Sequence, residues 1–229
     1  MTDKIDWTAA ETGLDMHGCA LLPKLLDAET CAALRDGWDA RDHFRSEVVM
    51  ARHGYGRGAY RYYAYPLPDP IAGLRATLYP PLARIANRWA AALGTPAFPE
   101  DHAAFLARCH ADGQTRPTPL LLRYETADWN ALHQDVYGEH VFPLQVAILL
   151  SAPGRDFTGG EFVLTEQRPR QQSRAEVVPL EAGDAVIFPV RERPVRGAHG
   201  WHRRALRHGV SRLRSGQRFA LGIIFHDAT

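Results

Sequence analysis

The chain has 229 residues, 45% of them hydrophobic, which is typical of one folded domain with a substantial core and excludes a disordered chain. Its 27 basic and 26 acidic side chains leave a formal charge of +1, so total charge favours neither nucleic acid nor a membrane surface as a partner. No stretch approaches the roughly 20 apolar residues that span a bilayer, and the three cysteines show no C-x-x-C spacing; we therefore expect no membrane association and a reducing, cytoplasmic location.

Residues 1–114 have mainly helical sequence patterns. A short apolar run at 18–22 ends at a proline and predicts an early strand. Asp27 precedes a stretch of helix-forming residues, and its carboxylate can accept hydrogen bonds from the free N–H groups of a first helical turn. We therefore expect a helix over 28–39.

A second helix is predicted over 71–93, where apolar residues recur at spacings of three and four and so share one helical face. These residues are Leu74, Leu78, Leu82, Ile85, Trp89 and Leu93. Pro80 and Pro81 lack the backbone N–H that a helix interior needs, so we expect an interruption there. The apolar face indicates core packing and not a cofactor site.

The segment 48–70 breaks the helical pattern, because it contains three glycines, five tyrosines and three prolines. Glycine and proline in this density indicate a loop or an irregular hairpin. Since its tyrosines alternate with arginines, we treat this segment as the candidate substrate loop of the N-terminal part.

From about Thr118 onward, short apolar runs are separated by Gly, Pro and Asp. Eight such runs are predicted strands, at 119–125, 131–136, 141–150, 161–165, 176–180, 184–190, 205–210 and 217–226. Because no helical pattern separates them, they favour an all-β jelly roll over parallel β-α-β units. We therefore predict an α+β fold, with a double-stranded β-helix core at 115–229 and the helical part packed on it as one compact unit.

The strongest candidate site begins at His133-Gln134-Asp135 in a predicted strand, where the period of two puts the His and Asp side chains on one face. His208, in a strand distant in sequence, is the best third ligand. Two imidazoles and one carboxylate form the facial set that holds iron(II) with open positions. Taken alone, H-x-D also fits a simple hydrogen-bonded pair, and His199 and His202 are rival third ligands.

Arg218 follows His208 by ten positions, in the predicted last strand. H-x-D, a distant His and then a basic residue about ten positions later resemble the pattern of the 2-oxoglutarate and iron(II)-dependent dioxygenases. The segments GGEFVL at 159–164 and EAGDAVIFP at 181–189 are similar to the prolyl-hydroxylase-like branch. The resemblance implies a jelly roll in which the iron(II) ligands are His133, Asp135 and His208. It also implies that Arg218 binds the distal carboxylate of 2-oxoglutarate, that O2 is the oxidant, and that ascorbate is a candidate reductant.

A second resemblance involves LLLRYETADWNALHQD, which is similar to a segment of AlkB-type nucleic-acid dealkylases. Tyr124 stands nine residues before His133, as in those enzymes, which implies a hydrogen bond from Tyr124 to 2-oxoglutarate; a tyrosine packed in the core is the alternative. Leu122 stands where an Asn is expected, and the AlkB-type Arg-x-Asn-x5-Arg signature is absent. Nearly the full chain also resembles a bacterial oxygenase family described as acting on damaged DNA.

The substrate prediction depends on two arginine-containing segments. Residues 55–63 offer aromatic faces for base stacking and guanidinium groups for phosphates, and an arginine cluster at 191–214 can follow a nucleic-acid backbone. The substrate candidates are Tyr55, Arg57, Tyr60 and Arg61. Alternatively, the tyrosines cover a core edge and the arginines pair with surface acids.

Three functions therefore remain open. The first is oxidative demethylation or hydroxylation of a nucleobase in alkylated DNA or RNA, which requires the base to be flipped out to the metal. The second is hydroxylation of a protein side chain or a small molecule. The third is a non-catalytic β-sandwich that binds a partner through its basic loop.

Overall fold

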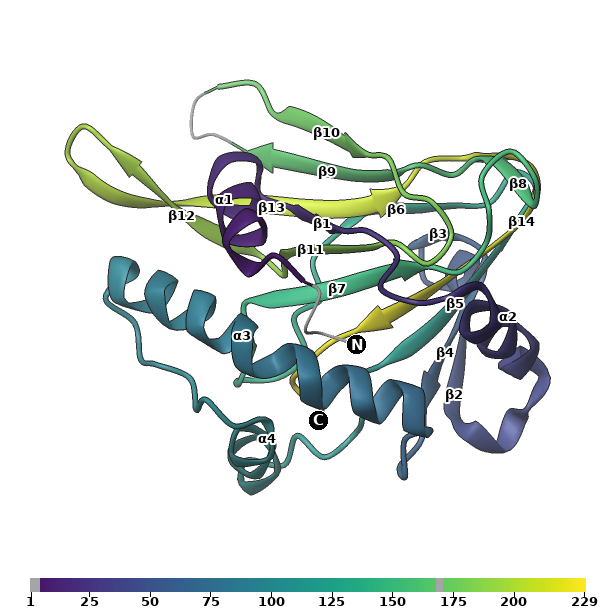
Figure 1. Ribbon diagram of the computed structural model, residues 1–229, viewed down its shortest axis with the longest axis horizontal. Helices are drawn as coiled ribbons and strands as arrows, with labels where there is room; N and C mark the ends of the chain where they lie inside the picture. Colours follow the sequence, from purple (N-terminus) through teal and green to yellow (C-terminus); the bar gives the residue numbers. More distant parts are fainter. Residues whose placement is uncertain (1–4, 168–170) are drawn as a thin grey trace.

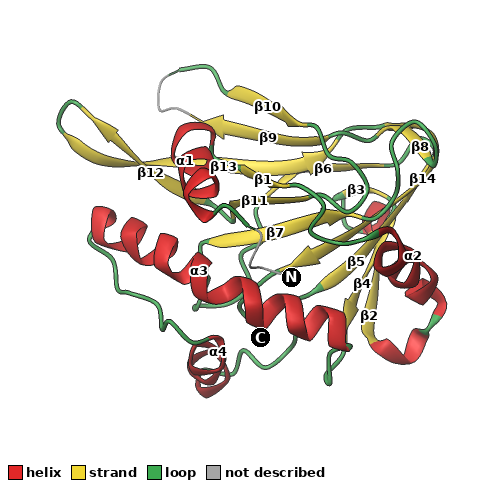
Figure 2. Ribbon diagram, in the orientation of Figure 1, coloured by secondary structure: helices red, strands yellow, loops and turns green. Residues whose placement is uncertain are grey.

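The computed structural model describes residues 5–167 and 171–229, which form two antiparallel β-sheets with helices packed against the larger one (Figures 1 and 2). The helices are α1 Trp7–His17, α2 Ala28–Asp36, α3 Asp69–Leu93 and α4 His102–Ala111, with 3₁₀ turns at Gly37–Asp39, Arg41–His43 and Met50–Arg52. The strands are β1 Ala20–Leu22, β2 Phe44–Val49, β3 Gly56–Arg57, β4 Ala59–Tyr63, β5 Leu120–Glu125, β6 Trp129–His133, β7 Leu144–Leu149, β8 Phe157–Gly159, β9 Phe162–Gln167, β10 Arg174–Val178, β11 Ala185–Pro189, β12 Glu192–Gly197, β13 Gly200–Val210 and β14 Leu213–Ile223. None of the helices in the described part has the length and apolarity needed to cross a membrane.

The larger sheet has the strand order β1-β11-β7-β14-β5-β4-β2, with β8 also paired to β14. The smaller sheet has the order β10-β9-β13-β6-β3, with β12 paired to β13. This two-sheet arrangement confirms the predicted α+β fold with a jelly-roll core and a packed N-terminal helical part. That part also contributes strands, because β4 pairs with β5 and extends the larger sheet.

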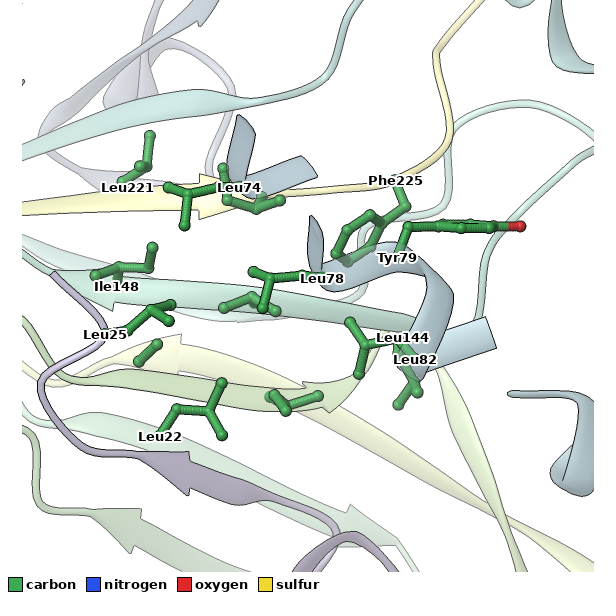
Figure 3. Close-up of a cluster of buried hydrophobic side chains, with 14 of the residues drawn as sticks. Leu22, Leu25, Leu74, Leu78, Tyr79, Leu82, Leu144, Ile148, Leu221 and Phe225 are labelled. Atoms are coloured by element: carbon green, nitrogen blue, oxygen red, sulfur yellow. The ribbon is translucent and has the colours of Figure 1, made fainter. Parts of the chain in front are cut away.

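The larger sheet separates two apolar cores, because side chains alternate along each strand. On β14, Leu221 and Ile223 face the helices, whereas the neighbouring Ala220 and Gly222 face the space between the sheets. Figure 3 shows the helix side, which contains side chains from α3, β7 and β14. The labelled residues there include Leu74, Leu78, Leu82, Leu144, Ile148 and Leu221. The helices thus support one face of the larger sheet and leave its other face to line a site.

The structure corrects the prediction that Pro80 and Pro81 interrupt the second helix. α3 is continuous from Asp69 to Leu93. The two prolines leave the carbonyl groups four positions earlier, on Ala76 and Thr77, without helical donors. Both residues are exposed, so water can hydrate those carbonyls, while the buried face of the helix continues on either side.

The first predicted helix is shorter than expected but has the expected cap. The carboxylate of Asp27 accepts a hydrogen bond from the N–H of Thr30 at 2.7 Å, and α2 runs to Asp36 before a 3₁₀ turn covers Gly37–Asp39. α1 and α4 were not predicted from the sequence. Each has the same kind of signal, an Asp cap at Asp6 or Asp101, but few large apolar residues.

The arginine-rich segment that we predicted as a loop is a β-hairpin. β12 and β13 pair along their length, from Glu192 opposite Ala205 to Gly197 opposite Gly200. The hairpin extends beyond the body of the protein at the upper left of Figure 1. Its polar sequence hides the strands because little of this part packs in the core, so there is no alternation of apolar residues to detect.

A buried ion pair ties α3 to the C-terminal segment. Arg75 donates to Asp227 at 2.7 Å and to the carbonyl of Ile224 at 2.9 Å, and both charged side chains are almost fully buried. We expect Arg75→Met to lower the free energy of unfolding by about 3 to 5 kcal/mol, because it leaves the Asp227 carboxylate buried without its arginine. Urea denaturation checks this, with exposed Arg84→Met on the same helix as the control. A loss under 1 kcal/mol contradicts the expectation.

Because two histidines are buried, we predict that the stability of the protein depends on pH. Burial lowers the pKa of His102 and of His226 to about 4. An unfolded histidine binds a proton below about pH 6.5, whereas these two resist it to about pH 4, so their contribution to stability is present above pH 6.5 and is lost as the pH falls toward 4.

As the pH falls from 7.5 to 5, each of these histidines should lower the free energy of unfolding by about 2 kcal/mol. His102 faces the carbonyl of Phe225 through Nε2 at 2.9 Å, a bond that a glutamine can keep without titrating. We therefore expect a smaller pH dependence in His102→Gln, measured by urea denaturation at both pH values. An unchanged dependence in that variant would assign the effect to other groups.

Candidate functional site

His133 and His208 come together because their strands pair. β6 and β13 are antiparallel neighbours in the smaller sheet, with His133 directly opposite His208 and the ring centroids 4.2 Å apart. Asp135 follows just after the end of β6. Its carboxylate oxygens lie 3.5 Å from Nε2 of His133 and 3.3 Å from Nε2 of His208. One ligand atom from each of the three residues lies within 4.8 Å of the others, so the predicted trio meets at one point.

Neighbouring hydrogen bonds orient the ligand atoms. Nδ1 of His133 contacts the carbonyl of Ala131 at 2.7 Å, which makes Nδ1 the donor and leaves Nε2 free as a ligand. The hydroxyl of Tyr137 donates to Asp135 Oδ1 at 2.8 Å and accepts from Tyr62 at 3.1 Å. Such outer contacts hold the first ligands in place and commonly tune metal affinity.

The electrostatics of the trio suit a cation. Burial opposes the charge on Asp135, but the hydrogen bonds and charges of His133 and His208 hold the pKa of its carboxyl well below the usual value. Burial and the nearby His133 lower the pKa of His208. Burial opposes protonation of His133 too, yet its contact with Asp135 raises its pKa overall. The ionised carboxylate thus attracts positive charge to the centre, where a metal ion can replace a proton.

The trio opens into a cavity of about 410 Å³ between the two sheets. Two aromatic rings flank His208 there, Phe188 at 4.7 Å and Phe162 at 6.1 Å between centroids. The larger sheet supplies polar groups on the opposite wall. These are Tyr60 of β4, Tyr124 of β5, Gln145 of β7 and Arg218 of β14. The cavity therefore combines a cluster of metal-ligating groups with a separate cationic end.

Arg218 lines this cavity opposite Tyr124, its direct register partner. Its side chain is 3% exposed, its Nε has no hydrogen-bond partner among the described residues, and its guanidinium carbon lies 5.6 Å from the Tyr124 ring centroid. Burial lowers the pKa of Arg218. A buried cation without an acidic partner is costly, so this position favours an anionic ligand.

Other buried arginines in the described ranges show the contrast. Arg75 pairs with Asp227 at 2.7 Å, and Arg193 pairs with Glu166 at 2.6 Å. Arg61 pairs with Glu47 at 2.7 Å. No ion pair joins Arg218 to any described residue, although Glu161 lies near enough to influence both groups electrostatically.

The structure places only some of the four substrate candidates at the cavity. Tyr55 and Tyr60 line the cavity. Arg57 is exposed outside it, with Nε 3.8 Å from Asp128. Arg61 follows Tyr60 on strand β4 and therefore faces the side of the sheet opposite to the cavity. There it donates to the Trp38 carbonyl and lies 4.4 Å from the Trp38 ring.

The rival ligands His199 and His202 lie on the exposed β12–β13 hairpin and are not part of the ligand cluster. Sequence reasoning missed Tyr137 and Gln145. Tyr137 stands two residues after Asp135, a spacing that keeps the period of two, whereas Gln145 lies within an apolar run and only its polarity marked it.

The chain matches a known family over most of its length. Residues 58–228 match a family model, Oxygenase-NA, described as "Oxygenase, catalysing oxidative methylation of damaged DNA". An uncharacterized protein of Mycobacterium tuberculosis (strain H37Rv) is 54% identical over 173 residues, which cover 75% of this chain and 74% of that protein.

Solved structures show the same fold at low identity. A 2OG-Fe(II) oxygenase family oxidoreductase from Burkholderia pseudomallei has a TM-score of 0.57 and 17% identity, covering 99% of this chain and 94% of that one. A prolyl-4-hydroxylase from Pseudomonas putida has a TM-score of 0.52 and 14% identity, covering 97% and 99%. At these identities the likeness concerns the fold.

Proposed function

We propose that this chain, which belongs to the oxygenase family described as catalysing oxidative methylation of damaged DNA, uses iron(II) and 2-oxoglutarate to oxidise an alkylated nucleobase. The observation that carries the proposal is one cavity with a His-Asp-His cluster and a buried arginine that has no ion pair in the described ranges. The cluster suits a metal and the arginine suits a carboxylate, so together they fit a metal centre and a dianionic cosubstrate.

The donor set fits iron(II). Two imidazole nitrogens and one carboxylate oxygen are the ligands of non-haem iron(II) oxygenases, and a three-ligand set leaves positions open. His133, Asp135 and His208 would hold the metal, with Tyr137 fixing the carboxylate through its 2.8 Å hydrogen bond. Bound iron(II) and 2-oxoglutarate would supply the electrons that activate O2, which is the oxidant of a substrate C–H bond.

The remaining cavity residues would bind and orient. Arg218 would form charge-assisted hydrogen bonds to the distal carboxylate of 2-oxoglutarate. The Tyr124 hydroxyl, which now accepts from Asn130 at 3.3 Å, would be a further hydrogen-bonding group for the same molecule. The rings of Phe162 and Phe188 would shield one side of the His208 imidazole from water, so that the metal centre lies beside an apolar wall of the cavity.

A nucleobase is the substrate class that the family description supports. At the cavity, Tyr55 is 50% exposed and stacks on His53 with ring centroids 5.3 Å apart. An exposed pair of stacked rings beside a cavity suits a planar base that leaves its strand to reach the metal. The ten-residue spacing from His208 to Arg218 instead favours the second candidate, a hydroxylase of a protein side chain or a small molecule.

The test measures succinate and product formation with iron(II), 2-oxoglutarate and O2. Short single strands that carry N-methylated adenine or cytosine are compared with unmodified strands, proline-containing peptides and free nucleosides, and Asp135→Ala is the inactive control. We expect methylated strands alone to raise succinate formation and to lose their methyl groups. Stimulation by peptides would support the second candidate, and succinate formation equal to that of Asp135→Ala with every substrate would remove both.

A further inference from the structure

The β12–β13 hairpin carries arginines on two faces with opposite surroundings. Arg193 of β12 and Arg204 of β13 are register partners on one face, and both pair with Glu166, at 2.6 and 2.7 Å. Because side chains alternate along a strand, Arg203 and Arg207 lie on the other face, and both are exposed. The inner arginines therefore share a carboxylate within the fold, and the outer ones face solvent.

The outer face also presents an aromatic ring. Trp201 lies near the tip of the hairpin, is 46% exposed, and has the guanidinium of its register partner Arg196 at 5.9 Å from its ring. Neither Arg196 nor Arg207 has an ion pair in the described ranges, whereas Arg203 has Glu192 at 3.4 Å. We name this set the arm face, composed of Arg196, Trp201, Arg203 and Arg207.

The arm face ends beside the strands that line the cavity. Arg207 directly precedes the ligand candidate His208 and lies on the outer face of the smaller sheet, and Gln134, which lines the cavity, donates to the neighbouring Leu206 carbonyl at 2.8 Å. Beyond it on the same outer surface lie Trp129, which is 40% exposed, and its register partner Arg57. Cations and indole rings therefore follow the outer surface of the smaller sheet, from the tip of the hairpin across β13 to β6 and β3.

We propose that the arm face binds the sugar-phosphate backbone and one base of a single-stranded nucleic acid whose damaged base enters the cavity. This inference rests on the proposed function and adds the surface that holds the strand. Arg203 and Arg207 are four residues apart, which is roughly 13 Å along a strand and suits cations that contact alternate phosphates of a single strand. Trp201 offers a stacking face that an acidic peptide would not require, so nucleic acid is favoured over a peptide.

The test uses fluorescence anisotropy with a labelled unmodified 12-nucleotide single strand and metal-free protein. The arm variant combines Arg196→Ala, Arg203→Ala and Arg207→Ala. The charge-matched control combines Arg41→Ala, Arg84→Ala and Arg108→Ala, three exposed arginines on a 3₁₀ turn, on α3 and on α4. We expect the arm variant to bind at least tenfold more weakly at 50 mM salt, with the slope of log K against log salt reduced by about 2, because each phosphate contact on a single strand contributes about 0.7. The control should stay within twofold of the unmodified protein.

A second variant separates stacking from charge. Trp201→Ala should weaken binding about tenfold and leave the salt slope unchanged. Equal affinity of the arm variant and its control overturns the inference, as does a wild-type protein that binds no strand at 50 mM salt. Equally tight binding of poly-glutamate, with no effect of Trp201→Ala, identifies a general anion surface and also overturns it.

Turnover keeps this inference distinct from the proposed function. With a methylated strand as substrate, the arm variant should raise KM at least tenfold and keep kcat within twofold, because the cavity is unchanged. Strand binding that depends on the arm face, without any turnover of methylated strands, would retain the arm face and remove the proposed chemistry. Turnover of methylated strands by the arm variant with an unchanged KM would retain the proposed chemistry and remove the arm face.

Discussion

Asp135→Ala is expected to abolish stoichiometric iron(II) binding while the protein stays folded. The carboxylate is the anionic member of the cluster, within 3.5 Å of both imidazoles, and without it two neutral histidines remain. Since loss of an outer contact alone commonly costs 10 to 100-fold in metal affinity, loss of a ligand should weaken binding by more than about 100-fold. Anaerobic titration with iron(II) and 2-oxoglutarate, followed by the visible absorption of the chelate, checks this.

The control for this experiment is Asp112→Ala. Asp112 also pairs with a histidine, His140, but on the surface and outside the cavity. It should bind iron(II) as the unmodified protein does, and circular dichroism should show the same fold for both variants. Retained iron(II) affinity in Asp135→Ala would remove the metal assignment, whatever the effect on turnover.

Arg218→Met is expected to weaken 2-oxoglutarate binding by about 10 to 150-fold, because a charge-assisted hydrogen bond contributes about 1.5 to 3 kcal/mol. The same change should leave the free energy of unfolding of the ligand-free protein unchanged or about 1 kcal/mol higher. Arg218 is buried without an ion pair in the described ranges, so methionine removes a costly charge and fills the same space. Calorimetric titration with 2-oxoglutarate and urea denaturation measure the two effects.

Arg193→Met is the matched control, because Arg193 is equally buried but donates two hydrogen bonds to Glu166. It should lose about 3 kcal/mol of stability and bind 2-oxoglutarate normally. Destabilisation of Arg218→Met by a similar amount, with 2-oxoglutarate affinity intact, would show that Arg218 is a structural residue.

The candidate site residues were more predictable from the sequence than the elements that surround them. His133 ends β6 and Asp135 follows two residues later, so the period of two assumed from the sequence was enough to place them together. His208 needed the resemblance to a family, because pairing of β6 with β13 spans 75 residues and no local pattern specifies it. The helix face of 71–93 was predictable for the opposite reason, since its apolar spacing is local.

What the sequence did not indicate depends on the surroundings that the fold gives to each segment. The pairing of β4 with β5 decides which side of the larger sheet Arg61 faces and turns it toward Trp38. Pro80 and Pro81 are helix breakers unless, as here, the carbonyls that they leave free face solvent. The strands of the β12–β13 hairpin are held by backbone pairing. Its arginine-rich sequence has no alternation of apolar residues from which strands could be predicted.

The candidate metal ligands and the candidate cosubstrate arginine belong to different sheets. His133 and His208 are on strands of the smaller sheet, and Arg218 is on the larger one. A molecule that chelates the metal and reaches the arginine would cross-link the two halves of the jelly roll. By mass action, a hundredfold excess over its dissociation constant adds about 2.7 kcal/mol to the stability of the folded state. The cellular supply of 2-oxoglutarate would then set not only the rate of the enzyme but also its resistance to thermal opening and proteolysis.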